Sequence, residues 1–214
     1  MIERIKSKIE RDGILGLIRT GCEIIKEAIY SDREAYYVVG NLSDDADGLK
    51  ARKNFDTVIH DKNSLHALEA SITNKELRDK IRRRILEGRV AFLGIVDKKV
   101  ATYWFATTHK EYEPVYGIHV RPEKDEVYFF DAHTFPEFRS AGHSSALLRE
   151  AMEYFRRRGY KKATAIVGVT NSPSLKVFSK NNFLKIKCIR TIRFAGFVVR
   201  RVVTNLDESD LPRK

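Results

Sequence analysis

The feature that constrains the fold most is a strand pattern that becomes a helix pattern through a loop of small residues. Val127–His133 is rich in aromatic residues and predicts a buried strand. Phe135–Phe138 contains a proline and two aromatics, and small residues then dominate Ser140–Ser145. Ser144–Arg157 places apolar residues at helical spacing. We therefore expect a strand–loop–helix unit whose loop lets another group approach the backbone closely.

The loop Arg139–Ser145 has the chemistry of an anion site. A helix start leaves backbone N–H groups without partners and carries partial positive charge. Gly142 can adopt a positive φ, and the positively charged guanidinium of Arg139 has paired donors that suit phosphate oxygens. The loop can therefore cradle a pyrophosphate. The other interpretation is a plain turn capped by Ser144, and the spacing alone leaves both open.

The remaining patterns predict an α/β chain with a mixed sheet. Further strands are expected at Glu34–Leu42, Val90–Val96, Val100–Thr107, Tyr116–Val120, Ala163–Val169, Leu184–Phe194 and Phe197–Val203. Further helices are expected at Leu65–Ile72, Lys75–Leu86 and Ser172–Lys180. Ser43–Asp61 is polar and is expected to be mostly loop.

The two ends of the chain differ from its middle. Residues 1–30 carry isoleucines at helical spacing, interrupted by glycines, and predict an amphipathic helical extension. Its charges nearly cancel, which favours packing on the domain or on a second chain over a membrane surface, with weak peripheral association left open. Residues 31–206 are expected to form the main domain, and residues 207–214 a polar tail. No apolar run is long enough to span a membrane.

Charge and cysteine usage limit the partners and the compartment. The net charge of +11 implies attraction to polyanions or simply a solvated basic surface. The triplets Arg82–Arg84 and Arg156–Arg158 lack interleaved aromatics, so a nucleic-acid partner is the weaker interpretation. Cys22 and Cys188 are far apart and have no metal-like spacing. Reduced thiols and the lack of a signal-like stretch predict a cytoplasmic protein with no metal.

Two motifs carry a family resemblance. The run from Thr134 to Ser144 resembles the acetyl-CoA motif of the GNAT superfamily of N-acetyltransferases, apolar-x-Pro-x-aromatic-Arg/Gln-x-x-Gly-x-Gly/Ala. Asn171–Ser174, followed by Phe178, Lys180 and Asn182-Phe183, is similar to the family's second conserved segment. With the order of elements, the resemblance covers about four fifths of the chain.

The resemblance implies a fold and a cofactor. The fold would be a mixed, mostly antiparallel sheet with splayed central strands, flanked by helices. A V-shaped opening would separate the strand ending near Phe135 from the strand ending near Val169, with a bulge near Pro136. Acetyl-CoA would bind there as co-substrate. Its implied contacts are Thr134, Phe135, Arg139, Ser140, Ala141, Gly142, His143, Ser144, Ser145, Asn171 and Phe178.

Three positions depart from the family pattern. Ser144 replaces the usual small glycine or alanine, and it is still able to cap a helix. Asn182 replaces a glycine, and asparagine tolerates the left-handed backbone better than most residues. Phe178 stands where many relatives have a tyrosine proposed to protonate the departing thiolate, and a phenyl ring has no proton to give.

The catalytic base is sought on the strand before the loop. Family bases often lie there, and Tyr128 holds an acceptor-facing position although a phenol is a poor base. Asp131 and His133 are two residues apart, so they share one face of the strand. Together they would form a base tuned near neutral pH, or else a polar pair that merely fixes the strand.

The resemblance therefore predicts an acetyl-CoA-dependent N-acetyltransferase that works by direct attack of an amine in a ternary complex. The alternatives are a non-catalytic acyl-CoA sensor, which Phe178 favours, and a nucleic-acid-associated protein. The acceptor would be a small-molecule amine or a protein amine, contacted by Ser43–Asp61 and His109–Arg121. The oligomeric state is not readable from the sequence.

Overall fold

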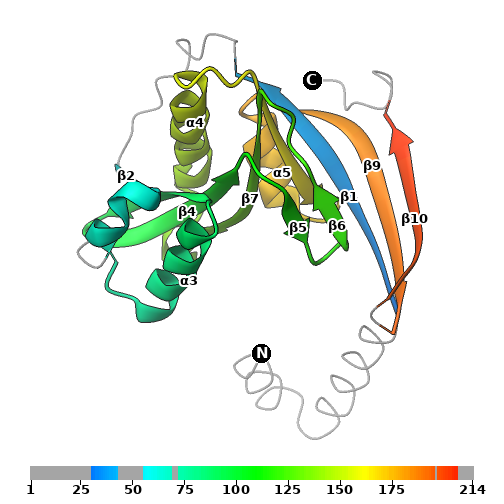
Figure 1. Cartoon of the computed structure of the whole chain (residues 1–214), viewed down its shortest axis with the longest axis horizontal. Helices are drawn as coiled ribbons and strands as arrows, with labels where there is room; N and C mark the ends of the chain where they lie inside the picture. Colours follow the sequence, from blue (N-terminus) through cyan, green and yellow to red (C-terminus); the bar gives the residue numbers. More distant parts are fainter. Residues whose placement is uncertain (1–29, 43–54, 69–71, 196, 207–214) are drawn as a thin grey trace, which may run out of the picture.

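A computed structural model describes residues 30–42, 55–68, 72–195 and 197–206 (Figure 1). The expected N-terminal extension, most of the expected loop after residue 43 and the polar tail lie outside the described residues. Over the described residues, the main sheet has eight strands in the order β10-β9-β1-β8-β7-β4-β3-β2, and β5 and β6 form a separate pair.

The strands are β1 (Tyr30–Asn41), β2 (Asp56–His60), β3 (Val90–Val96), β4 (Lys99–Thr107), β5 (Glu111–Glu113), β6 (Ile118–Val120), β7 (Glu126–Thr134), β8 (Lys162–Gly168), β9 (Leu184–Phe194) and β10 (Phe197–Asn205). The helices in the described part of the chain are α3 (Lys75–Leu86), α4 (His143–Arg156) and α5 (Ser172–Ser179), with 3-10 turns η2 (Lys62–Ala67) and η3 (Pro136–Phe138). The predicted mixed, mostly antiparallel sheet flanked by helices is confirmed, with β7–β8 as its parallel pair.

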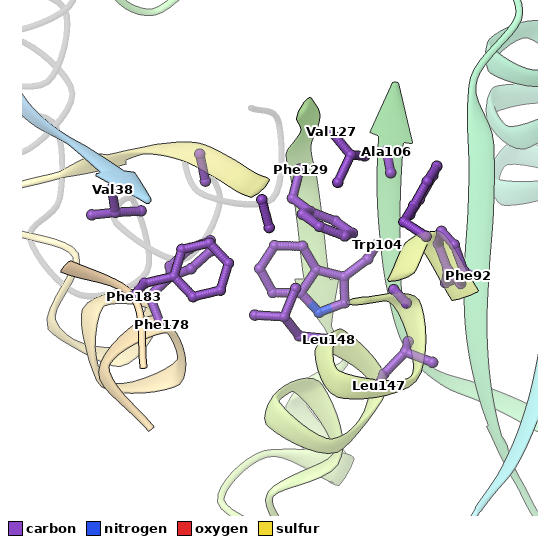
Figure 2. Packing of buried hydrophobic residues seen from close by; sticks show 14 of the residues in the cluster. Val38, Phe92, Trp104, Ala106, Val127, Phe129, Leu147, Leu148, Phe178 and Phe183 are labelled. Carbon is purple, nitrogen blue, oxygen red and sulfur yellow. The ribbon is translucent and has the colours of Figure 1, made fainter. Parts of the chain in front are cut away.

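Helices cover both faces of the sheet. Neighbouring strand residues point to opposite sides, so a central strand can pack against helices on both faces. Trp104 and Phe129 meet α4 and α5 on one face, and Figure 2 shows Trp104 beside Phe129 and Leu148, with Phe178 and Phe183 next to it. On the other face, Tyr103, Phe105 and Tyr128 join a second apolar cluster with Ile81 and Ile85 of α3.

The central strands β7 and β8 separate within the sheet. Their register runs only from Glu126 opposite Lys162 to Phe129 opposite Ala165, although both strands continue beyond it. On the other side of β7, Tyr103 faces His133 and Phe105 faces Phe130. Two β7 residues, 131 and 132, therefore stand opposite the single β4 residue 104, and this is a β-bulge.

The position of the bulge corrects the sequence prediction. Asp131 has a φ of 48°, so the irregularity lies there and not at Pro136. Pro136 instead begins the 3-10 turn η3 after the strand has ended. A short polar residue tolerates the left-handed backbone that the bulge requires.

Three other expectations need correction. The stretch expected to be mostly loop contains β2, which pairs with β3 at one edge of the sheet. The helix expected at Leu65–Ile72 begins as the 3-10 turn η2 and is α-helical at Leu68, whose carbonyl accepts the Ile72 N–H at 3.2 Å. The strand β5 was not expected. The hairpin between β3 and β4 is confirmed, and it turns through Asp97 and Lys98, which have φ values of 47° and 63°.

Candidate active site

The start of α4 is open toward solvent. Gly142 is its N-cap residue, has a φ of 80° and provides no side-chain cap for the first turn. A Cβ placed on Gly142 would meet nothing within 4 Å. Ser140, two residues earlier, also has a positive φ, of 65°. The loop therefore leaves room beside backbone N–H groups that the helix itself does not satisfy.

The side chains of the first turn of α4 face the protein interior. His143 is buried, with its ring 5.5 Å from that of Phe55. The Ser145 hydroxyl accepts a hydrogen bond of 2.9 Å from the Asn181 amide. The alternative interpretation, a turn capped by Ser144, does not hold, because Gly142 is the N-cap and Ser144 lies within the first turn. The Ser144 hydroxyl and carbonyl instead accept the Trp104 indole N–H at 3.2 Å. These contacts fix the helix start.

The end of β7 is tied to β4 and to the loop. The Phe135 N–H donates to the Ala101 carbonyl at 3.0 Å, and the Thr134 hydroxyl lies 3.0 Å from that of Thr102. Arg139 donates through Nε to the Thr134 carbonyl at 3.2 Å. Some polar groups expected to meet an extended ligand are therefore already engaged within the protein.

The wall across from β7 is built by β8 and α5. Asn171 is the N-cap of α5, and its side-chain oxygen accepts the Ser174 N–H at 3.2 Å. Phe178 is only 3% exposed, because its ring packs edge-on against Trp104 and Phe183. It therefore belongs to the apolar core beneath the opening.

Asp131 and His133 do not form the expected pair. The Asp131 carboxylate accepts a 2.8 Å hydrogen bond from Lys80 and lies 3.7 Å from the Arg84 guanidinium. His133 instead stacks on Tyr103, with ring centroids 5.7 Å apart. Burial lowers the pKa of His133, nearby cations lower it further, and the Asp131 charge opposes them. The imidazole is therefore neutral at neutral pH.

Tyr128 is fully buried just before the point where β7 and β8 separate. Its hydroxyl donates a 2.7 Å hydrogen bond to Glu113 of β5. Burial raises the pKa of Tyr128 well above its usual value, so it remains a phenol. Sequence reasoning missed Glu113, because a strand of three residues gives no pattern that would single out one carboxylate.

The loop between β5 and β6 crosses the sheet toward the end of β8. A Cβ on Gly168 would lie 2.8 Å from the Tyr116 hydroxyl, so Tyr116 occupies the space above that glycine. Arg193 of β9 donates to the Pro114 carbonyl at 2.7 Å, and Arg201 of β10 donates to the Gly117 carbonyl at 2.6 Å. The loop is thereby anchored on both strands of the C-terminal hairpin.

A cleft of about 560 Å³ lies beside this loop. It is lined by Tyr30, Ser31, Asp32, Arg33, Glu34, Tyr116, Gly168, Val169 and Thr170. Asp32 is held by Arg190, which lowers the pKa of that carboxyl. Clefts of this size accommodate small-molecule ligands.

In the parts of the chain that the structure describes, no three His, Cys, Asp or Glu side chains form a group that could hold a metal ion. The described helices include none with the length and apolarity needed to cross a membrane.

The fold and the motif are those of a known family. The sequence profile of the Acetyltransferase (GNAT) family matches residues 78–183. The chain belongs to the GNAT superfamily. The family is one of acetyltransferases.

Solved structures share the fold at low sequence identity. A tandem GNAT protein from the clavulanic acid biosynthesis pathway has 15% identity and a TM-score of 0.53, over 82% of this chain and 58% of that one. A glucosamine N-acetyltransferase region in a fungal multi-domain β-N-acetylglucosaminidase has 13% identity and a TM-score of 0.52, over 84% and 23%. A GNAT acetyltransferase from Colwellia psychrerythraea has 12% identity and a TM-score of 0.50, over 81% of this chain and 60% of that one.

The aligned part of this chain thus spans about three fifths or less of the length of these three structures. A search of curated proteins gave no match.

Proposed function

We propose that the protein is an acetyl-CoA-dependent N-acetyltransferase, with residues 31–206 as its catalytic domain, and that it moves acetyl to an amine by direct attack in a ternary complex. The observation that carries this proposal is the open, uncapped start of α4 at Gly142, beside the strands that separate. A helix start of this kind suits an anionic pyrophosphate.

The residues present fit coenzyme A. The backbone N–H groups from Ala141 to Ser145 would hold the pyrophosphate, with Ser140 shaping the loop and Arg139 adding positive charge. Thr134 and Phe135 would line the path of the pantetheine arm, and Asn171 would reach it through its amide NH₂. Phe178 would support the arm from below. When bound, the cofactor supplies an acetyl thioester whose carbon–sulfur bond breaks as the amine nitrogen bonds to the carbonyl carbon.

The acceptor, a small-molecule or protein amine, would enter from the α3 face, where the cleft beside Tyr116 lies. Direct attack needs no enzyme nucleophile, because two reactants held in place gain much of their rate from proximity. The described cysteine, Cys188, lies on β9, and burial raises the pKa of its thiol. A raised thiol pKa disfavours the thiolate that a covalent acetyl-cysteine route would need.

The test of the cofactor site is Gly142→Glu, measured by calorimetric titration with coenzyme A. The new carboxylate would stand where the pyrophosphate is bound, so we expect affinity to fall by roughly a hundredfold or more, about 3 kcal/mol. Gly159→Glu is the matched control, because Gly159 also has a positive φ, of 86°, and open space around its Cβ, but lies beyond the other end of α4. Equal affinity in both variants would contradict the proposed cradle.

A second candidate function is a non-catalytic acyl-CoA sensor. Phe178 favours it, since that ring cannot protonate a leaving thiolate. Release of free thiol from acetyl-CoA, followed with a panel of amines, separates the two functions. Tight binding without release for any amine would favour the sensor.

A further inference from the structure

The β5–β6 hairpin approaches the opening between β7 and β8 from the α3 face, and Figure 1 shows it in front of β7 and β1. Glu113 contacts β7 through Tyr128, and Tyr116 covers Gly168 at the end of β8. One short segment therefore reaches both strands where they part. An amine that approaches a thioester held between these strands from this face would pass the hairpin.

Glu113 is the carboxylate of this segment that is least committed to ion pairs. Glu111, two residues earlier, is only 4% exposed and accepts a 2.8 Å hydrogen bond from Arg89. Asp131 is paired with Lys80. Glu113 is partly buried, and its described partner is the neutral hydroxyl of Tyr128. It is therefore able to gain a proton without breaking an ion pair.

We infer that Glu113 is the base that takes the ammonium proton of the acceptor, an inference that rests on the proposed acetyl transfer. One amine proton goes to a Glu113 carboxylate oxygen and then to solvent. The second proton leaves with the sulfur, which keeps the electron pair of the broken carbon–sulfur bond. The products are an amide, a thiol and one released proton, and no proton donor at Phe178 is required.

The surroundings of Glu113 tune it for this role. Burial raises its pKa, and the charges of Glu111 and Asp131 raise it further, whereas the Tyr128 hydrogen bond and the Arg84 charge lower it. A carboxylate with a raised pKa is a better base near neutral pH than an exposed one. Tyr128 acts as a positioning residue, because its hydrogen bond favours the ionised carboxylate.

The first test is steady-state kinetics of the full chain with a panel of amines: a diamine, a polyamine, an amino sugar, an aromatic ethylamine and a lysine peptide. Glu113→Gln should lower kcat/KM by about a hundredfold or more for amines that are protonated at the assay pH. The loss should be much smaller for trifluoroethylamine, which is already neutral. Glu76→Gln, an exposed carboxylate change at the start of α3, should leave activity unchanged.

The pH profile gives the direction of the effect. In the wild type, activity should fall as the pH drops through the raised pKa of Glu113. Glu113→Gln should remove this acid limb, and Tyr128→Phe should move it to higher pH, since the lost hydrogen bond had favoured the charged form. If the acid limb of Tyr128→Phe stays at the wild-type pH, that result would count against Glu113 as the base.

The second test does not depend on activity. The carboxyl band of Glu113, isolated as the infrared difference between wild type and Glu113→Gln, should titrate above the usual range for glutamate and higher still in Tyr128→Phe. Titration in the ordinary range for an exposed glutamate would overturn the inference.

The outcomes also separate this inference from the proposed function. Full turnover in Glu113→Gln, with a hundredfold loss in His133→Gln, would overturn the role of Glu113 and leave acetyl transfer intact. A wild type that transfers acetyl to none of the amines would overturn the proposed function and the base with it.

Discussion

His60 is a histidine buried on a short edge strand, with 1% of its surface exposed. Within the described residues neither ring nitrogen makes a well-formed hydrogen bond. Burial lowers the pKa of the ring, and the Ser64 backbone and the Asp61 charge only partly oppose this. The folded protein therefore holds His60 neutral at a pH where the unfolded chain binds a proton.

This predicts an acid-dependent loss of stability. The contribution of His60 is fully present above about pH 6.5, the usual value for histidine, and is lost as the pH falls through the lower folded pKa. His60→Phe should weaken this dependence and change the unfolding free energy at pH 8 by no more than about 1 kcal/mol. Urea unfolding from pH 8 to pH 5 measures both effects. His66→Gln, at an exposed histidine of η2, should keep the wild-type dependence, and the same slope in all three proteins would refute the prediction.

The sequence reveals the roles of some single residues and not of others. The role of Gly142 was open to prediction, because a residue without a Cβ can adopt the positive φ found at this helix start whatever surrounds it. Glu113 was not, because its role depends on a tyrosine that reaches it from β7. The conformational freedom of a residue can be predicted from its type, whereas a hydrogen bond between residues far apart in the sequence cannot.

Among the elements, the turn between α5 and β9 tests a conformational prediction. Asn182 was expected to replace a glycine in a left-handed position, and its φ of 60° confirms this. Asn182→Gly should keep or slightly raise stability, because glycine has no Cβ to clash in this backbone. Asn182→Ala should lower stability by about 1 kcal/mol, because alanine keeps the Cβ but lacks the short polar side chain whose local hydrogen bonds let asparagine tolerate this backbone. Thermal unfolding of the two variants measures the difference. An alanine variant as stable as the glycine variant would contradict the expected strain.

The elements that sequence patterns located are the long ones. α3 and the strands around the β3–β4 turn lie where periodicity placed them, because each carries several apolar residues at one spacing. β2 and β5 were missed, since short strands are defined by the partner with which they pair. The bulge at Asp131 was misplaced for a related reason, because the mismatch with Trp104 on β4 creates it.

At the scale of the whole molecule, the basic C-terminal hairpin has a structural use. Arg193 and Arg201 hold carbonyl groups of the β5–β6 loop, and Arg190 holds Asp32. Part of the high positive charge thus makes contacts within the chain at its surface. The sequence showed the charge but not these partners, because they lie far away along the chain.

The order of strands in the sheet predicts a gradient of protection. β1 lies between β8 and β9, whereas β10 pairs with β9 alone and all of its described side chains are exposed. Amide hydrogen exchange followed by mass spectrometry should therefore be slowest in β1 and at least about a hundredfold faster along β10. Equal protection in β1 and β10 would contradict the picture of β10 as an open edge.

The position of β1 has a consequence for synthesis of the chain. β1 leaves the ribosome first among the described strands, yet its partners are β8 and β9, near the other end of the sequence. At about 5–20 residues per second, it waits for roughly ten seconds before a partner exists. During that interval Tyr30–Asn41 is an unpaired, tyrosine- and valine-rich segment. We therefore expect the backbone of β1 to stay without sheet partners, and open to wrong pairings, until β8 has been translated.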